Sequence, residues 1–152
     1  MMKRRMMICA LVALVFGLVG GVQAKEEVPL THFDLARVMA NAAGIEIGVK
    51  TMVQLAAELT EEGIAPLGGW NVIENPVAKI GDLVVTVLQV TGNADKVTGD
   101  AAGLAKAAKE VLGMDVEDTC VPKDLTSGRA WELMNTPELK GKGLAMNFAT
   151  PD

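Results

Sequence analysis

The chain of 152 residues has a formal net charge of −5 at pH 7, from 14 basic and 19 acidic residues. Three of the bases and none of the acids lie in the first 24 residues, so the rest of the chain carries 11 − 19 = −8. This excess of acid argues against nucleic-acid binding and against attraction to anionic lipid, because both depend on Lys and Arg.

The chain begins like a secretory signal peptide. Basic residues at positions 3–5 lead into an apolar run from Met6 to Val19, and small residues follow up to Ala24. A basic region, a short apolar core and small residues at a cleavage site define such a peptide. We expect cleavage after residue 24 and export across the inner membrane, to the periplasm or the cell envelope. The apolar run is short for a spanning helix, which needs about 20 apolar residues, so we expect no membrane segment after cleavage.

Two helices are predicted next. Thr31, followed three residues later by Asp34, forms the capping-box pattern of a helix start. Apolar residues then recur at helical spacing until Gly44, which is expected to end this helix. A second amphipathic helix is expected from about Val49 to Glu62.

A glycine-rich loop is predicted at residues 63–70, because three glycines and a proline within eight residues exclude a regular element. Ile64 and Trp70 are expected to anchor this loop in the core. The apolar stretch from Ile80 to Val90 fits a buried helix or a strand, since valine and threonine favour strands. We assign it to a helix because of its length and because of the repeat described below.

A fourth helix is predicted from an Asp100 N-cap to Leu112, and a short fifth helix, carrying Trp131, from about Leu125 to Met134. The tail at 137–152 contains Gly141, Gly143 and Pro151 and is expected to be loosely ordered. The sequence therefore predicts one mostly α domain at residues 25–136, a small bundle of about four to five helices with a glycine-rich loop.

An internal repeat emerges when the chain is shifted by 48 residues. Asp34-Leu35-Ala36 then aligns with Asp82-Leu83-Val84, and Gly44 aligns with Gly92. A period near 50 indicates a duplicated supersecondary unit. We expect the two copies at about residues 29–62 and 63–92, with further helices at about 100–134.

This unit resembles the S-layer homology (SLH) module. The string from Leu30 to Ala36 lies where such modules carry a hydrophobic residue followed by Thr-Arg-Ala-Glu, and Gly63-Ile64 matches the Gly-Ile that ends their preceding helix. Trp70 and Pro76 approximate the later aromatic residue and proline. The resemblance covers residues 29–92, about half of the expected mature chain.

The resemblance implies a wall-binding module in which the arginine of the motif helps to hold an anionic polysaccharide. His32 and Ile80 stand at the two arginine positions of this sequence, and the charge of −8 also disfavours an anionic ligand. A pseudo-trimeric SLH unit would need a third copy. The region from Asp100 to Met134 has helices for one but lacks the Thr-x-x-acid-Leu-Ala string.

The residues suited to catalysis are few. After residue 24 the chain has one histidine, His32, one serine, Ser127, one cysteine, Cys120, and no tyrosine. Ser127 lacks the flanking glycines of a nucleophile elbow, and a single histidine does not make the usual zinc site. We therefore expect no catalytic residues, no metal and no cofactor. Cys120 is expected to be a small buried hydrophobe, with an intermolecular disulfide as the less favoured alternative.

The leading hypothesis is a non-catalytic binding or scaffold module of the cell envelope, associated with cell-wall polymer or with an envelope protein. Its expected binding residues surround two helix starts and the glycine-rich loop: Thr31, His32, Asp34, Trp70 and Asp82. Trp70 is expected either to stack on a sugar or to fill the core, and His32 either to bind a ligand or to lie at the surface. The alternatives are a helical protein–protein interaction or structural protein without glycan binding and, less favoured, a hydrolase that uses paired carboxylates.

Overall fold

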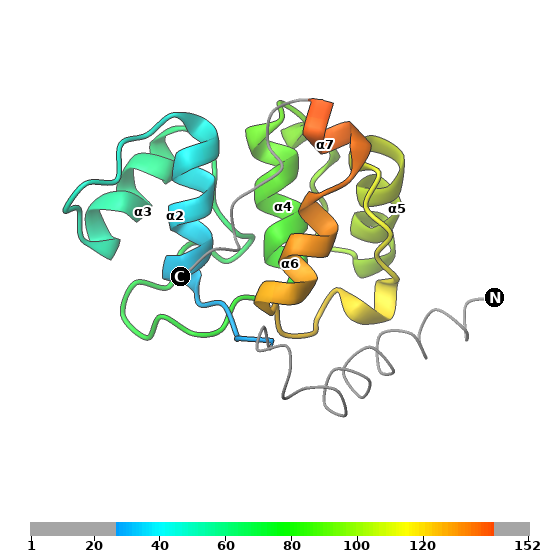
Figure 1. Cartoon of the computed structure of the whole chain (residues 1–152), viewed down its shortest axis with the longest axis horizontal. Helices are drawn as coiled ribbons and strands as arrows, with labels where there is room; N and C mark the ends of the chain where they lie inside the picture. The colour runs from blue at the N-terminus through cyan, green and yellow to red at the C-terminus, as the bar shows by residue number, and fades with distance from the viewer. Residues whose placement is uncertain (1–26, 142–152) are drawn as a thin grey trace.

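The computed structural model describes residues 27–141, so the expected signal peptide at 1–24 and the last residues, 142–152, lie outside the described part. The described chain is mostly helical, as predicted, and has no regular β-strand (Figure 1). It contains two short 3₁₀ helices, η1 (Ala94–Lys96) and η2 (Asp118–Cys120). Its six α-helices are α2 (His32–Ala43), α3 (Met52–Glu61), α4 (Ile80–Val90), α5 (Ala101–Leu112), α6 (Ser127–Met134) and α7 (Pro137–Gly141).

A closed ring of backbone hydrogen bonds joins three short extended segments, residues 29–31, 77–79 and 124–126. The amide of Leu30 donates to the carbonyl of Leu125, that of Ala78 to Leu30, and that of Leu125 to Ala78, at 3.0, 2.8 and 2.8 Å. Each segment is joined to each of the other two by one antiparallel β-bridge. Because each middle residue both donates and accepts, the ring satisfies backbone groups that would otherwise be buried without partners.

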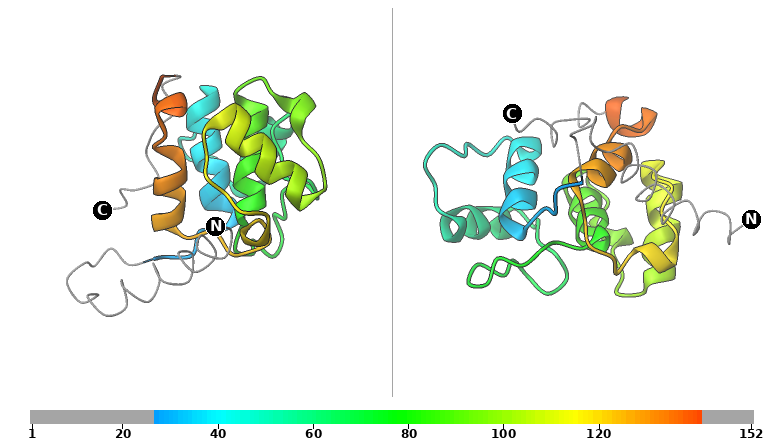
Figure 2. Two further views of the ribbon diagram at one scale, coloured as in Figure 1. Left: turned by 90° about the vertical axis from the view of Figure 1, so that its right-hand side faces the viewer. Right: turned by 60° about the horizontal axis from the view of Figure 1, so that its bottom comes forward.

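Each ring segment continues directly into a helix, so that α2, α4 and α6 start from the same place and lie beside one another (Figures 1 and 2). Thr31 caps α2, Lys79 precedes α4 and Thr126 caps α6. The first helical amides are also bound in a cyclic way, with His32 donating to Pro76, Ile80 to Lys123 and Ser127 to Val28. Three helix starts are thereby held in a common register.

The hydrophobic core lies between these three helices and the second helices that follow two of them. α3 packs on α2, α5 packs on α4, and α2 packs against α4. The largest fully buried side chains come from all of these elements and from the connections: Leu35, Met39, Leu55, Leu59, Leu83, Val84, Leu88, Leu112, Met114, Leu125, Met134 and Leu139. Cys120 is also buried in the core, as expected.

Local sequence signals place most helix ends correctly. Thr31 and Asp34 form the predicted capping box, Asp100 caps α5 through the amide of Gly103, and the ambiguous stretch from Ile80 to Val90 is a helix. Gly44 adopts a left-handed backbone with φ of 77°, which favours glycine at a helix end. The second helix starts three residues later than predicted, because Thr51 and Gln54 form a capping box there.

The prediction of a loosely ordered tail from residue 137 is wrong for residues 137–141, which form α7. Leu139 on this helix is fully buried. The hydroxyl of Thr136 donates to the carbonyl of Leu112 at 3.0 Å and accepts the amide of Leu139. Burial of one leucine and these two bonds hold the short helix against the end of α5.

Candidate functional site

Two of the predicted binding residues serve the start of α2. The amide of Thr31 donates to Oδ2 of Asp34 at 2.9 Å, and the amide of Asp34 donates to Oγ1 of Thr31 at 3.2 Å. The Thr31 hydroxyl also bonds the same carboxylate oxygen at 3.1 Å. Both side chains therefore satisfy helix-terminal groups that would otherwise lack partners.

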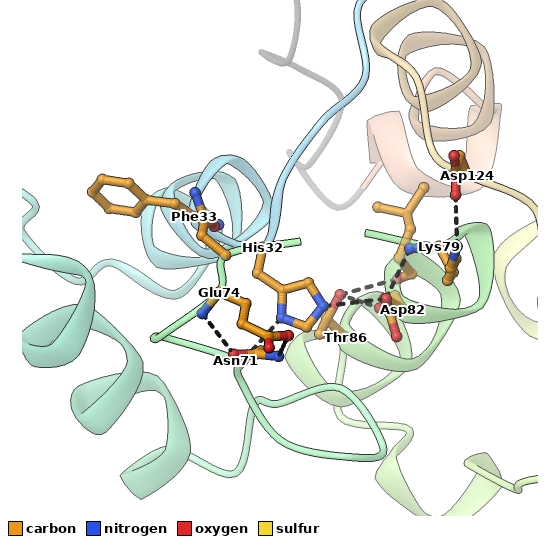
Figure 3. A network of polar contacts seen from close by, with 10 residues as sticks. His32, Phe33, Asn71, Glu74, Lys79, Asp82, Thr86 and Asp124 are labelled. Carbon is orange, nitrogen blue, oxygen red and sulfur yellow. Dashed lines mark hydrogen bonds and ion pairs between the residues drawn. The ribbon is translucent and has the colours of Figure 1, made fainter. Parts of the chain in front are cut away.

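His32 is buried and bridges three elements, so the expectation of a surface position is wrong. The side chain comes from the first turn of α2, and the residue is only 8% exposed. Its Nδ1 accepts the amide of Asn71 at 3.1 Å, and its Nε2 lies 3.6 Å from Oδ2 of Asp82 on α4 (Figure 3). Because Nδ1 is an acceptor, the proton of the neutral imidazole belongs on Nε2, facing the carboxylate.

Asp82 links this contact to the ring. Its Oδ2 accepts the amide of Lys79 at 2.8 Å, which caps the start of α4. The ammonium group of Lys79 in turn lies 2.6 Å from Oδ1 of Asp124, in the third ring segment (Figure 3). Both partners of that ion pair are more than half exposed, so it adds little to stability. The polar network thus connects α2, α4 and the segment that leads to α6.

Trp70 lies against His32, half-buried at the edge of the core. The two rings meet edge to face, with centroids 5.9 Å apart and planes at 88°. The indole Nε1 donates to the carbonyl of Ile64 at 3.0 Å, so its one polar group is used within the loop. Ile64 itself is buried, as predicted. Trp70 therefore closes the glycine-rich loop on itself and fixes it to α2.

A tight turn at residues 71–75 follows, and sequence reasoning missed its role. Oδ1 of Asn71 accepts the amide of Glu74 at 3.0 Å, and the amide of Asn75 donates to the carbonyl of Asn71 at 3.1 Å. Asn75 has φ of 44°, and its Oδ1 accepts the amide of Phe33 at 2.8 Å, capping α2 a second time. Asparagine tolerates this left-handed backbone better than most residues.

This turn presents apolar side chains to solvent. Ile73 is 91% exposed and Leu67, on the same loop, is 56% exposed. We refer to residues 65–74 as the presented loop. The sequence signals that could have found it are Asn71 and Asn75, since asparagine side chains bond nearby backbone groups in turns. The sequence has no such signal for the exposure of Ile73, because this exposure depends on how the loop is fixed to α2.

The five predicted residues thus separate into two groups. His32, Asp82 and Trp70 come together between α2, α4 and the presented loop, whereas Thr31 and Asp34 form the helix cap beside them. Within residues 27–141, no three His, Cys, Asp or Glu side chains gather as metal ligands. The cluster as arranged can fix the presented loop in one position, since both imidazole nitrogens and the indole N–H face partners in the chain.

Comparisons with known proteins do not extend these observations: no family model matches the chain, and no characterised protein or solved structure is significantly similar to it. None of the helices in the described part is both long and apolar enough to cross a membrane.

Proposed function

We propose that the protein is an exported, non-catalytic binding or scaffold module of the cell envelope. Residues 1–24 support export, because they have the pattern of a signal peptide. The observation that carries the binding role is the presented loop, in which a fixed turn holds Ile73 at 91% exposure. Fixing a surface loop in advance reduces the conformational entropy lost on binding.

The internal bonding of the cluster supports binding over catalysis. A general acid or base must reach the reacting proton, yet His32 is 8% exposed and both its ring nitrogens face groups of the chain. A hydrolase that uses paired carboxylates stays the less favoured alternative.

The SLH resemblance is part of this proposal. α2 and α4 start 48 residues apart, each with an aspartate, Asp34 or Asp82, that bonds the amide of the N-cap residue. A third ring segment leads into α6 from Thr126, which caps the helix as Thr31 caps α2. These correspondences support three related units. His32 and Trp70 lie at the boundary between the first two of them, between α2 and α4. Cell-wall polymer is the ligand that the resemblance implies, with Trp70 as the stacking residue.

A second candidate is an envelope protein as partner, and the exposure of Ile73 and Leu67 favours it. Aliphatic side chains gain most from a partner that removes them from water, and apolar pockets on proteins do so. Polysaccharides offer mainly hydroxyl groups and ring faces, which suit an aromatic residue such as Trp70. The two candidates therefore depend on different side chains of one loop.

The test is co-sedimentation of the chain from Lys25 to Asp152 with isolated cell-wall sacculi, with and without their attached polymers. Trp70→Phe keeps an aromatic ring but loses the indole N–H, and Trp70→Leu removes the aromatic face altogether. Pelleting that needs the polymers and is lost in Trp70→Leu but kept in Trp70→Phe supports polymer binding. Protein left in the supernatant in all conditions counts against a wall ligand.

The protein-partner candidate is tested by cross-linking the same chain to solubilised envelope proteins. Ile73→Ser is expected to remove the cross-linked species. Val49→Ser is the matched control, because Val49 is 100% exposed but lies on the loop before α3. Equal cross-linking by the parent chain and by Ile73→Ser would reject the presented loop as the contact.

A further inference from the structure

The ring places three helix pairs in equivalent positions. Each of α2, α4 and α6 is followed by a second helix, α3, α5 or α7. After α3 the chain returns through residues 62–76 to the second ring segment, and after α5 it returns through residues 113–123 to the third. Residues 142–152 follow α7.

The two returning connections each cover a boundary between neighbouring ring helices. The first bonds α2 through Asn71 and His32, and it bonds α4 through the amide of Ala65, which donates to Oε1 of Gln89 at 2.8 Å. The second bonds α4 through the amide of Gly81, which donates to the carbonyl of Val121 at 2.8 Å. It also bonds α6, since Nη2 of Arg129 donates to the carbonyl of Asp115 at 3.2 Å.

The third boundary, between α6 and the segment that precedes α2, carries exposed apolar side chains. The position four residues after each helix start is fully buried in α2 (Ala36) and α4 (Val84), but Trp131 at this position in α6 is 51% exposed. Trp131 shares a helix face with Ser127, one turn earlier. Ser127 contacts Val28, its Oγ accepting the Val28 amide at 3.2 Å, and Val28 is 56% exposed. We call these three residues the Trp131–Val28 face.

We propose that the C-terminal tail, residues 142–152, docks on the Trp131–Val28 face and covers the third boundary. The tail follows α7 as the two connections follow α3 and α5. It carries three large apolar residues, Leu144, Met146 and Phe148, which suit a tryptophan and a valine. Its eleven residues reach about 35 Å when extended, whereas an eight-residue helix such as α6 is about 12 Å long, so the tail can span the face.

The test follows Trp131 fluorescence in the chain from Lys25 to Asp152 with Trp70→Phe, which leaves Trp131 as the single tryptophan. The triple variant Leu144→Ser, Met146→Ser, Phe148→Ser is expected to shift Trp131 emission to longer wavelength and to increase acrylamide quenching. It is also expected to lower the thermal midpoint by roughly 5 °C, because apolar burial is lost. The matched control, Lys142→Ser with Asn147→Ser, is expected to leave all three unchanged.

A second measurement applies even if the triple variant fails to fold. A spin label on Ala149→Cys is expected to broaden the indole N–H signal of Trp131, and Cys120 does not compete for the label because it is 1% exposed. Broadening that persists when labelled chain is diluted with unlabelled chain supports the tail of the same molecule. The proposal is overturned if the spin label causes no broadening of the Trp131 signal, or if Trp131 is quenched equally in the parent chain and the triple variant. It is also overturned if the protection of Trp131 disappears when the protein is diluted to a monomer, which would favour a second copy as the occupant.

Discussion

The imidazole of His32, in the first turn of α2, stands 3.6 Å from the carboxylate of Asp82, in the first turn of α4. These two residues are 50 positions apart in the sequence, and the ring of backbone hydrogen bonds brings their helix starts together. The contact uses the only histidine of the described chain as a structural bridge, with the presented loop bound to its other nitrogen.

His32→Ala is expected to lower the free energy of unfolding by about 2 kcal/mol, because the partly buried Asn71 amide loses its acceptor and the space beside Trp70 is left empty. The measurement is urea unfolding followed by circular dichroism. Glu61→Ala, at an exposed site on α3, is the control and is expected to change little. Equal stability of His32→Ala and the parent chain would contradict the bridging role.

Asn75 provides a test of the turn that presents Ile73. Asn75→Ala removes the acceptor of the Phe33 amide and leaves alanine in the left-handed backbone conformation at φ of 44°, which alanine disfavours. We therefore expect the free energy of unfolding to fall by about 2 kcal/mol. Asn75→Gly loses the same acceptor but relieves the backbone strain, and should cost about 1 kcal/mol less than the alanine variant. The order of the two unfolding midpoints in urea decides the matter, and alanine at or above glycine would be the contrary result.

The ring makes close packing necessary at Gly81, near the start of α4. A Cβ added there would lie 2.9 Å from Cγ1 of Val121 and 3.3 Å from its carbonyl oxygen, which accepts the Gly81 amide. Gly81→Ala is therefore expected to destabilise the domain by about 1–3 kcal/mol, although alanine favours a helix over glycine. Calorimetry of Gly81→Ala with and without Val121→Ala tests whether the clash with Val121 is the cause. The smaller alanine at position 121 should restore part of the lost stability. A more stable Gly81→Ala variant would mean that the ring tolerates movement there.

The N-caps of the ring helices give a further prediction. Thr31→Ala and Thr126→Ala are each expected to cost about 1 kcal/mol, the usual value for a lost side-chain cap. Thr126→Ala should cost more than Thr31→Ala, because the Thr126 hydroxyl donates at 2.7 Å to Oε1 of Glu27 in the N-terminal segment, whereas the Thr31 hydroxyl donates at 3.1 Å to Asp34 of its own helix. Chemical unfolding of the two variants and of Thr126→Ala with Glu27→Gln measures the difference. Thr31→Ala as the more damaging variant would show that the N-terminal segment contributes little.

For the candidate site, the sequence predicted which residues lie there better than it predicted what each of them does. It selected Thr31, His32, Asp34, Trp70 and Asp82 because they cluster near helix starts and a glycine-rich loop. The structure brings three of them together, but it buries His32 and uses the indole N–H of Trp70 inside the loop. Ile73, the most exposed large apolar side chain of the presented loop, was not selected, since an isolated apolar residue has no local signal of exposure.

The sequence by itself determined the helical class and most helix ends, because these depend on neighbours within one turn. The Thr31–Asp34 capping box and the glycine at position 44 act over three or four residues, and a single sequence contains that information. Only the tertiary structure decided the ring, the burial of His32 and the ordered α7. The ring depends on backbone groups that meet across 47 or more positions, such as Leu125 with Ala78, and backbone hydrogen bonds carry no side-chain signature. The burial of His32 and the ordering of α7 depend on contacts with residues 39 and 24 positions away, Asn71 for His32 and Leu112 for Thr136.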